Sequence, residues 1–247
     1  MDPIIRAHGL VKRYGTLTAV AGIDFAVAPG ECFGLLGPNG AGKTTTAHML
    51  CCVLPITDGD IWVAGLSARQ APRRIKAMLG VCPQESNLDT DFSVRHNLVA
   101  YARCFDIPAA AALCRAEALL DRFHLRDKAA VCVDDLSGGL KKRLLVARCF
   151  VNDPAVVVLD EPTTGLDPQS KHQIWDEVRE LKRAGTTVIL TTHYMEEAAL
   201  LCDRLIIMDQ GRIIAGGAPG ALVAQHLDGQ GTLEDVFLKL TGRQLRE

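Results

Sequence analysis

The sequence predicts an α/β protein: a mostly parallel sheet core with an antiparallel β subdomain and an inserted α-helical subdomain. Three observations predict this class. A buried β-prone run, ECFGLLG at 31–37, enters a glycine-rich turn, and another, AVVVLDEP at 155–162, ends in carboxylates. Alanine- and leucine-rich helical sequence fills 88–150. Short β-prone runs punctuated by glycines fill 4–30 and predict antiparallel hairpins.

The remaining elements follow from local patterns. We expect a helix over 43–53, a strand over 58–65, a short helix and strand over 72–84, a strand over 186–193 and a hairpin over 204–217 that turns at Gln210-Gly211. Ile174, Val178 and Leu181 share one helix face, and Gly185 ends that helix. The predicted division is 1–87 with 151–225 for the core and β subdomain, 88–150 for the helical subdomain and 226–247 for a C-terminal helical tail.

Composition narrows the function class. The net charge of −2 indicates no general affinity for nucleic acid or acidic lipid. No stretch is apolar enough to span a membrane and the N-terminus lacks a signal-peptide core, so any membrane contact is expected through a partner only. The nine cysteines are odd in number and form no C-x-x-C motif, which favours buried thiols in a reducing, cytoplasmic compartment over zinc or redox sites.

A phosphate-binding loop fits G-x-x-x-x-G-K-[ST] without a gap. Its glycines free backbone N–H groups to surround phosphates, and the following helix adds its N-terminal dipole. Lys43 would bridge the β- and γ-phosphates of ATP, and the Thr44 hydroxyl would ligate Mg²⁺. The alternative is a plain glycine turn with a surface lysine. The predicted loop residues are Gly37, Pro38, Asn39, Gly40, Ala41, Gly42, Lys43, Thr44 and Thr45.

Two adjacent carboxylates end the strand predicted at 155–160. Asp160 is placed to hold the metal ion, and Glu161 to polarise an attacking water, because phosphoryl transfer depends on positioning and charge stabilisation. Alone, such a pair is as often a solvated loop charge. Together with a phosphate loop, the catalytic interpretation is favoured.

Further motifs occur in a fixed order: PQ at 83–84, LSGGLKKRL at 136–144 and TTH at 191–193. This set resembles the nucleotide-binding subunit of ATP-binding cassette (ABC) transporters, over about Ile4 to Arg243. The resemblance implies a P-loop NTPase fold of the ABC-ATPase type. It also implies that Tyr14 stacks on adenine, that Gln84 senses the γ-phosphate and Mg²⁺, that His193 contacts the γ-phosphate and that Asp167 lies where two copies meet.

The family works as a head-to-tail dimer. Ser137, Gly138 and Gly139 open a basic helix, an anion site that would complete the nucleotide site of the opposite copy. Two identical chains would thus enclose two Mg-ATP and drive a separately encoded transmembrane permease. The resemblance places the protein peripherally on the inner face of the cell membrane.

Two features indicate a branch of the family. The tail TLEDVFLKLTGRQLRE at 232–247 is similar to that of drug and lipo-oligosaccharide exporter ATPases, including the Nod-factor and daunorubicin types. It also forms an amphipathic helix, with an apolar face of Leu233, Val236, Phe237 and Leu240, that would suit docking onto its own domain. Many exporters of this type carry a small extra domain between the last core helix and the tail. Here the eleven residues ALVAQHLDGQG at 221–231 cross that gap, so a regulatory role of such a domain is not expected. Leu140 stands where the family usually has glutamine.

Alternatives remain open. An ABC import subunit shares the same ATP chemistry, and a soluble ABC ATPase of iron–sulfur assembly has a similar size; a phosphate-loop kinase or small GTPase lacks the LSGG string. A permease socket and ordinary core packing explain equally well the apolar residues that follow Gln84, namely Leu88, Phe92, Val94 and Leu98.

Overall fold

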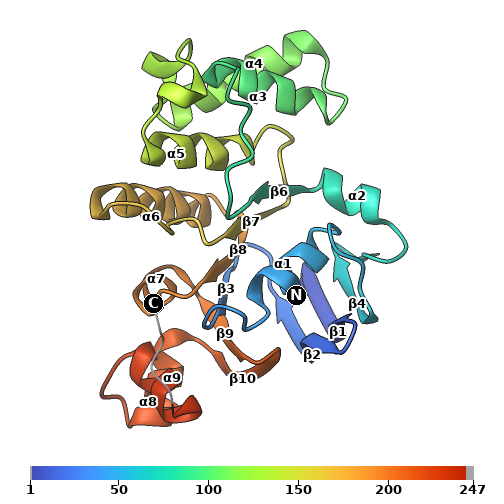
Figure 1. Ribbon diagram of the computed structural model, residues 1–247, viewed down its shortest axis with the longest axis vertical. Coiled ribbons are helices and arrows are strands. Elements are labelled where there is room, and N and C mark those ends of the chain that lie inside the picture. Colours follow the sequence, from blue (N-terminus) through green and yellow to red (C-terminus); the bar gives the residue numbers. More distant parts are fainter. Residues whose placement is uncertain (1, 243–247) are drawn as a thin grey trace. The chain divides into compact units, whose positions relative to one another are not determined.

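The computed structural model describes residues 2–242 and divides the chain into two units. The first holds the residues up to Lys76 together with those from Val178 on, and the second is Ala77–Glu177. Figure 1 labels the elements of both. The helix α6 (Pro168–Arg183) crosses the boundary and buries Ile174, Val178 and Leu181, the face that their spacing predicts.

The predicted hairpins form an antiparallel sheet in the first unit. Its order is β2-β1-β4-β5, with β1 (Ile5–Tyr14), β2 (Leu17–Val27), β4 (Asp58–Val63) and β5 (Leu66–Ser67). The pairs β1–β2, β1–β4 and β4–β5 are all antiparallel. Burial alternates from Ile5 to His8, and the register of β1 against β2 shifts between Ala7 and Leu10, around Gly9.

Parallel strands lie at the centre of the first unit. The strand β3 (Cys32–Leu36) is buried at every residue and pairs in parallel with β8 (Thr187–Thr192) and β9 (Arg204–Asp209). The predicted hairpin is confirmed, because β10 (Arg212–Gly217) pairs antiparallel with β9. Gln210 and Gly211 both have positive φ, 48° and 75°, as a tight two-residue turn between strands requires.

The second unit contains two parallel strands and a set of helices. The strands β6 (Leu79–Cys82) and β7 (Val156–Asp160) pair in register from Leu79–Val156 to Cys82–Leu159. Between them lie α3 (Val94–Arg103), α4 (Ala109–Arg122), α5 (Gly138–Arg148) and two 3-10 turns, η1 (Arg126–Lys128) and η2 (Val133–Asp135). Among the described residues between β6 and β7, the β-structure is limited to one isolated antiparallel bridge, which joins Ser93 and Cys132. The prediction of a helical insert is confirmed.

Two helix predictions need correction. The helix α1 (Lys43–Leu50) ends three residues before the predicted Val53, since Cys52 turns into the left-handed region with φ 54° and the amides of Val53 and Leu54 bond back to the His48 carbonyl. The second correction is α7 (Met195–Leu201), a helix that the sequence analysis does not predict. The short α2 (Pro72–Ala77) lies within the range 72–84 predicted for a short helix and strand.

The C-terminal region contains one helix more than predicted. The stretch 221–231 is mostly helix, because α8 (Pro219–Leu227) precedes the predicted tail helix α9 (Leu233–Thr241). Thr232 and Asp235 form a capping box that starts α9. Leu233, Val236 and Phe237 are buried as predicted, but Leu240 is 36% exposed. Arg243 and the rest of the predicted tail, 244–247, lie outside the described residues.

The helix α9 contacts α7 and α8. Its buried apolar side chains should determine the free energy with which it docks on them. Phe237→Ala removes a ring that is 2% exposed and should weaken docking by about 3 kcal/mol. The amides of α9 should then exchange hydrogen roughly a hundredfold faster, as measured by mass spectrometry. Leu240→Ala is the matched control and should change exchange little. Equal effects of both variants would contradict this account of the docking.

Candidate active site

The predicted site residues fall into two groups, one in each unit. Tyr14, His193 and the phosphate loop belong to the first unit. The second group is Gln84, Ser137, Gly138, Gly139, Asp160, Glu161 and Asp167. Each group is described within its own unit.

The phosphate loop connects the buried strand β3 to α1. Lys43, which is buried, donates hydrogen bonds from Nζ to the carbonyls of Gly37 and Pro38 at 2.8 and 3.1 Å. Its ammonium is thereby held over the loop, where it would face the phosphates of a nucleotide. Thr44 and Thr45 are partly exposed in the first turn of α1, and Asn39 and Gly40 are exposed at the tip of the loop.

Glycine is required where other backbones press on this loop. A Cβ on Gly42 would lie 2.6 Å from the Ala19 carbonyl oxygen, and Gly42 has φ 104°. A Cβ on Gly37 would overlap the Met208 carbonyl oxygen. Gly40 has open space around it, so only its φ of 81° favours glycine. The loop is therefore packed between β2 and β9 and keeps its form without a ligand.

The hairpin turn at Gly211 fastens this packing. The Gly211 amide donates to the Ala41 carbonyl at 3.0 Å, and its carbonyl accepts from the Ala21 amide at 2.9 Å. A Cβ on Gly211 would lie 2.7 Å from the Ala19 oxygen. The sequence indicates the turn but not its second role, which is to join β2 to the phosphate loop.

Tyr14 ends β1 with its side chain 45% exposed. Lys12 lies over the ring, with Nζ 4.9 Å from the ring centroid. A partly exposed tyrosine ring is suited to stacking on a nucleobase, in keeping with the predicted role. Sequence reasoning missed Lys12, whose contact with Tyr14 fits the period of two along one strand face.

His193 follows β8 and precedes α7, at the end of a parallel strand where ligands bind in α/β proteins. Its ring lies 4.1 Å from that of Tyr194, and the Tyr194 amide donates to the Thr192 hydroxyl at 3.0 Å. The turn that presents the histidine is therefore held by both of its neighbours.

In the second unit, Gln84 and Glu161 come together. Gln84 follows β6 and Glu161 follows β7, so both stand at the carboxyl end of paired parallel strands. Gln84 donates from Nε2 to Glu161 Oε2 at 3.1 Å, and Thr164 donates to the same oxygen at 3.2 Å. The structure thus brings together the residue predicted to sense the γ-phosphate and the residue predicted to polarise the attacking water.

Glu161 has an unusual backbone. Its φ is 46°, a left-handed conformation that is costly for a residue with a side chain, and it is almost fully buried. Asp160, the last residue of β7, is also buried. Two adjacent buried carboxylates contradict the interpretation as solvated loop charges, since burial of charge is expensive without a role or a partner.

Ser137 is the N-cap of α5, and its hydroxyl accepts a hydrogen bond from the Leu140 amide at 3.4 Å. Ser137 and Gly138 are exposed. The basic residues that follow are not simply an anion site: Lys142 is buried and donates to the carbonyls of Pro83 and Gln84 at 3.3 and 3.4 Å. The helix therefore positions the backbone of Gln84, a contact that the sequence does not indicate.

A second link connects Gly139 with Asp167. Ser170 donates its hydroxyl to Asp167 Oδ1 at 2.6 Å and its amide to Oδ2 at 3.1 Å. These bonds hold the pKa of Asp167 below its ordinary value. A Cβ on Gly139 would collide with the Ser170 hydroxyl, whereas one on Gly138 meets open space. Of these two glycines, Gly139 is therefore the one whose lack of a side chain makes room for Ser170.

The proposed permease socket is mostly core. Leu88, Val94 and Leu98 are buried, so amphipathic packing explains them. Phe92 is 40% exposed and is the member of the four that remains available on the surface.

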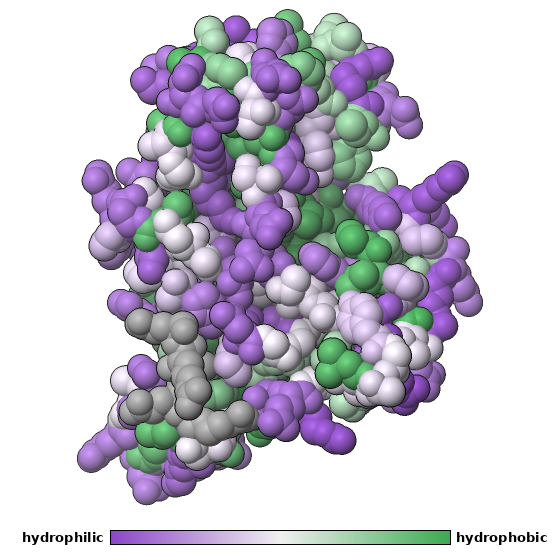
Figure 2. Space-filling model, in the orientation of Figure 1, coloured by the Kyte–Doolittle hydropathy of each residue, from purple (hydrophilic) through white to green (hydrophobic). Residues whose placement is uncertain are grey.

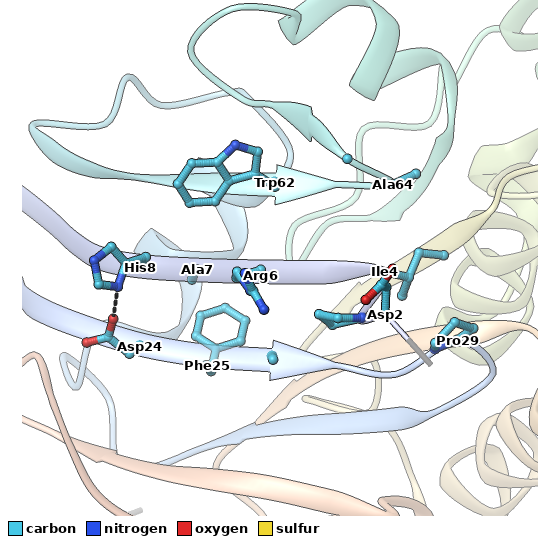
Figure 3. A pocket seen from close by; sticks show the side chains of 13 residues that line it. Asp2, Ile4, Arg6, Ala7, His8, Asp24, Phe25, Pro29, Trp62 and Ala64 are labelled. Carbon is cyan, nitrogen blue, oxygen red and sulfur yellow. Dashed lines mark hydrogen bonds and ion pairs between the residues drawn. The ribbon is translucent and has the colours of Figure 1, made fainter.

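A separate hollow of about 1090 Å³ lies on the antiparallel sheet. Figure 3 shows Trp62 from β4, Arg6 and His8 from β1, and Asp24 from β2 along it, with His8 Nδ1 2.7 Å from Asp24 Oδ1. None of the predicted nucleotide residues lines this hollow. This hollow is therefore distinct from the predicted nucleotide site.

Comparison with known proteins identifies the family. The model of the family described as ABC transporter matches residues 20–164. Nod factor export ATP-binding protein I of Paraburkholderia xenovorans (strain LB400) is 51% identical over 216 residues, covering 87% of this chain and 71% of the relative. The chain belongs to the ABC transporter family. It is an ATP-binding, ATP-hydrolysing subunit of a transporter.

Other relatives of this ABC subunit agree. The protein of the same description from Ralstonia nicotianae (strain ATCC BAA-1114 / GMI1000) is 48% identical over 225 residues, which covers 91% of this chain and 70% of the relative. A solved structure described as the ATP binding subunit of an ABC transporter aligns with TM-score 0.85 at 25% identity, over 96% of this chain and 99% of that one. The ABC-ATPase fold predicted from sequence is confirmed. No helix among residues 2–242 is long and apolar enough to cross a membrane.

The glycine pair of this cassette gives a test of the packing around Asp167. Gly139→Ala should lower the free energy of unfolding by about 1–2 kcal/mol, because the Ser170 hydroxyl must leave Asp167 to make room. Gly138→Ala should change it by less than about 0.5 kcal/mol. Chemical denaturation measures both.

The double variant Gly139→Ala/Ser170→Ala supplies the control. With the hydroxyl gone, the two losses should not add, and the coupling should be about 1 kcal/mol. Additive losses would show that Ser170 does not contact residue 139 in solution.

Proposed function

We propose that this ABC subunit powers an exporter of lipo-oligosaccharides or related amphiphiles. The observation that carries the proposal is the 51% identity to a relative described as a Nod factor export ATP-binding protein, over 71% of that relative. Both relatives compared above are described as export subunits, which favours export over import and iron–sulfur assembly. Two copies would act with a separately encoded membrane permease, which selects the cargo.

The proposed roles follow from the two groups of residues. Lys43 and the loop amides bind the phosphates, and the partly exposed Tyr14 ring stacks on the base. Glu161 orients the attacking water, with its carboxylate held by Gln84 and Thr164. Ser137, Gly138 and Gly139 stay exposed or partly exposed to receive the nucleotide of a second copy, near Asp167.

The donor types of the predicted ligands, one in the first unit and two in the second, suit a magnesium ion. Thr44, Asp160 and Gln84 offer a hydroxyl, a carboxylate and an amide oxygen, the hard oxygen ligands that Mg²⁺ prefers. The nearly complete burial of the Asp160 carboxylate is in keeping with a cation partner. When bound, the ion would neutralise charge on the β- and γ-phosphates.

Closure and opening of the dimer would be driven by differential affinity. ATP held between two copies favours the closed pair, and its hydrolysis removes that advantage. The chain would then act at the inner face of the cell membrane, attached to its permease.

Glu161→Gln tests the catalytic assignment. The amide keeps the shape and the hydrogen bond to Thr164 but cannot accept a proton, so turnover should fall at least about a hundredfold while ATP affinity is retained. Phosphate release and nucleotide binding measure the two effects. Glu85→Gln, at an exposed neighbouring position, is the matched control and should retain full activity. Rapid hydrolysis by the Glu161 variant would remove Glu161 from its proposed role.

The same variant, tagged and expressed in its native host, tests the transporter assignment. A single polytopic protein should co-purify with it from gently solubilised membranes, and loss of that protein's gene should abolish export of the cargo. Recovery from the soluble fraction alone, with a cysteine-rich scaffold protein or ribosomes, would overturn the exporter proposal.

A further inference from the structure

Four basic side chains lie close together at α2 without an acidic neighbour in sequence. Arg69, Arg73, Arg74 and Lys76 are all exposed, and no Asp or Glu occurs from residue 61 to residue 84. None of the four forms an ion pair with another residue among 2–242. Ile75 is the residue of α2 that is buried, so the cations project into solvent. Residues 61–84 therefore carry four positive charges and no negative one, in a chain whose net charge is −2, and the acidic residues that precede this stretch, Asp58 and Asp60, flank the Gly59 that Arg69 contacts.

An apolar turn, Val53–Ile56, stands beside these cations. Val53 is 61% exposed and Leu54 and Ile56 are partly exposed. The turn is fixed to β1: Lys12 donates from Nζ to the Pro55 carbonyl at 2.7 Å, and the Thr57 amide donates to the Val11 carbonyl at 3.0 Å. The exposed aliphatic side chains are therefore presented by a held turn.

The two segments form one surface. A hollow of about 440 Å³ is lined both by Val53–Ile56 and by Arg69 and Pro72. Arg69 is held by its Nε, which donates to the Gly59 carbonyl at 2.8 Å. Burial raises the pKa of the Cys52 thiol, the charge of Lys76 lowers it and the charge of Asp60 raises it, so both charges act on the residue that follows α1 and its C-cap. In Figure 2 hydrophilic side chains gather over α2, with hydrophobic ones beside them.

We propose that this surface, Val53–Ile56 with Arg69, Arg73, Arg74 and Lys76, binds directly to the anionic surface of a lipid bilayer. The proposal rests on the proposed function, in which the subunit works at a membrane, and adds a contact that does not pass through the permease. The cations would pair with lipid phosphates, and the Val53 side chain would reach the layer beneath them.

The chemistry favours lipid over an acidic protein segment. Arg69 is held at its Nε, whereas Arg73, Arg74 and Lys76 make no hydrogen bond or ion pair with another of residues 2–242. These three cations stand on long stems, which suits headgroups that can rearrange. An aliphatic turn next to cations matches the order of a bilayer surface, where phosphates lie over hydrocarbon.

Vesicle sedimentation with the full chain tests the proposal. We expect binding to vesicles of phosphatidylcholine with added phosphatidylglycerol, little binding to pure phosphatidylcholine, and release by salt. Replacing Arg69, Arg73, Arg74 and Lys76 together by Gln should weaken binding on the order of a hundredfold, because each basic residue near an anionic surface contributes several-fold. Val53→Ser should weaken it several-fold and leave the salt dependence unchanged.

A charge-matched variant is the control. Replacing four exposed cations elsewhere by Gln gives the same net charge and should keep binding within about threefold of the original chain, because the attraction is local. These four are Arg115, Arg183, Arg212 and Lys239. ATP hydrolysis without vesicles should be equal for all variants, which shows that each one folds.

Three results would overturn the proposal. The first is that the original chain does not bind anionic vesicles. The second is that the control variant loses as much vesicle binding as the α2 variant. The third is that no variant binds vesicles and that the α2 variant also loses the co-purifying membrane protein. The last result would assign the surface to a protein partner. Failure of the proposed function is separate, because it shows in the co-purification of the Glu161 variant and not in vesicle binding.

Discussion

The close approach of three backbone segments at the phosphate loop is the constraint on which the first unit depends. Residues 37–42 lie against Ala19 and Met208 so tightly that a Cβ on Gly37 or Gly42 has no room. The hydrogen bonds of Gly211 then join β2, the loop and the β9–β10 turn into one piece. Because these contacts are between backbones, the loop is preorganised to offer its N–H groups, and less ordering entropy is lost when phosphate binds.

The second unit depends on a different constraint, the burial of carboxylates at the end of β7. Glu161 is held in a left-handed conformation and accepts from both Gln84 and Thr164. Gln84 is itself positioned by the ammonium of Lys142, which bonds to its carbonyl. A residue of α5, the helix that begins in the LSGG string, therefore positions the residue whose side chain bonds to the carboxylate of Glu161. A shift of α5 would therefore reach Glu161 through two hydrogen bonds, from Lys142 to the Gln84 carbonyl and from the Gln84 side chain to Glu161.

The sequence predicts the elements whose cause is local and misses the contacts between distant segments. The phosphate loop, the Gln210-Gly211 hairpin and the buried face of α6 follow from glycine placement and apolar spacing. The same apolar spacing does not say what covers a face, so Leu98 suggested a socket and is core. Lys142 is 58 positions from Gln84, and no pattern along the chain pairs them. The end of α1 at Leu50 depends on the backbone of Cys52, for which cysteine gives no signal.

The departure at Leu140 can be judged from the same geometry. Residue 140 contributes its amide to the Ser137 hydroxyl, and any residue except proline supplies that amide. Gly139 must stay small because Ser170 lies against it, and Ser170 in turn orients Asp167. The hydrogen bonds and close contacts that shape this motif therefore involve Ser137, Gly139 and Ser170, and residue 140 contributes its backbone amide to them. Leucine in place of glutamine leaves the start of α5 and the position of Asp167 intact, which is why ATP turnover can persist with this substitution.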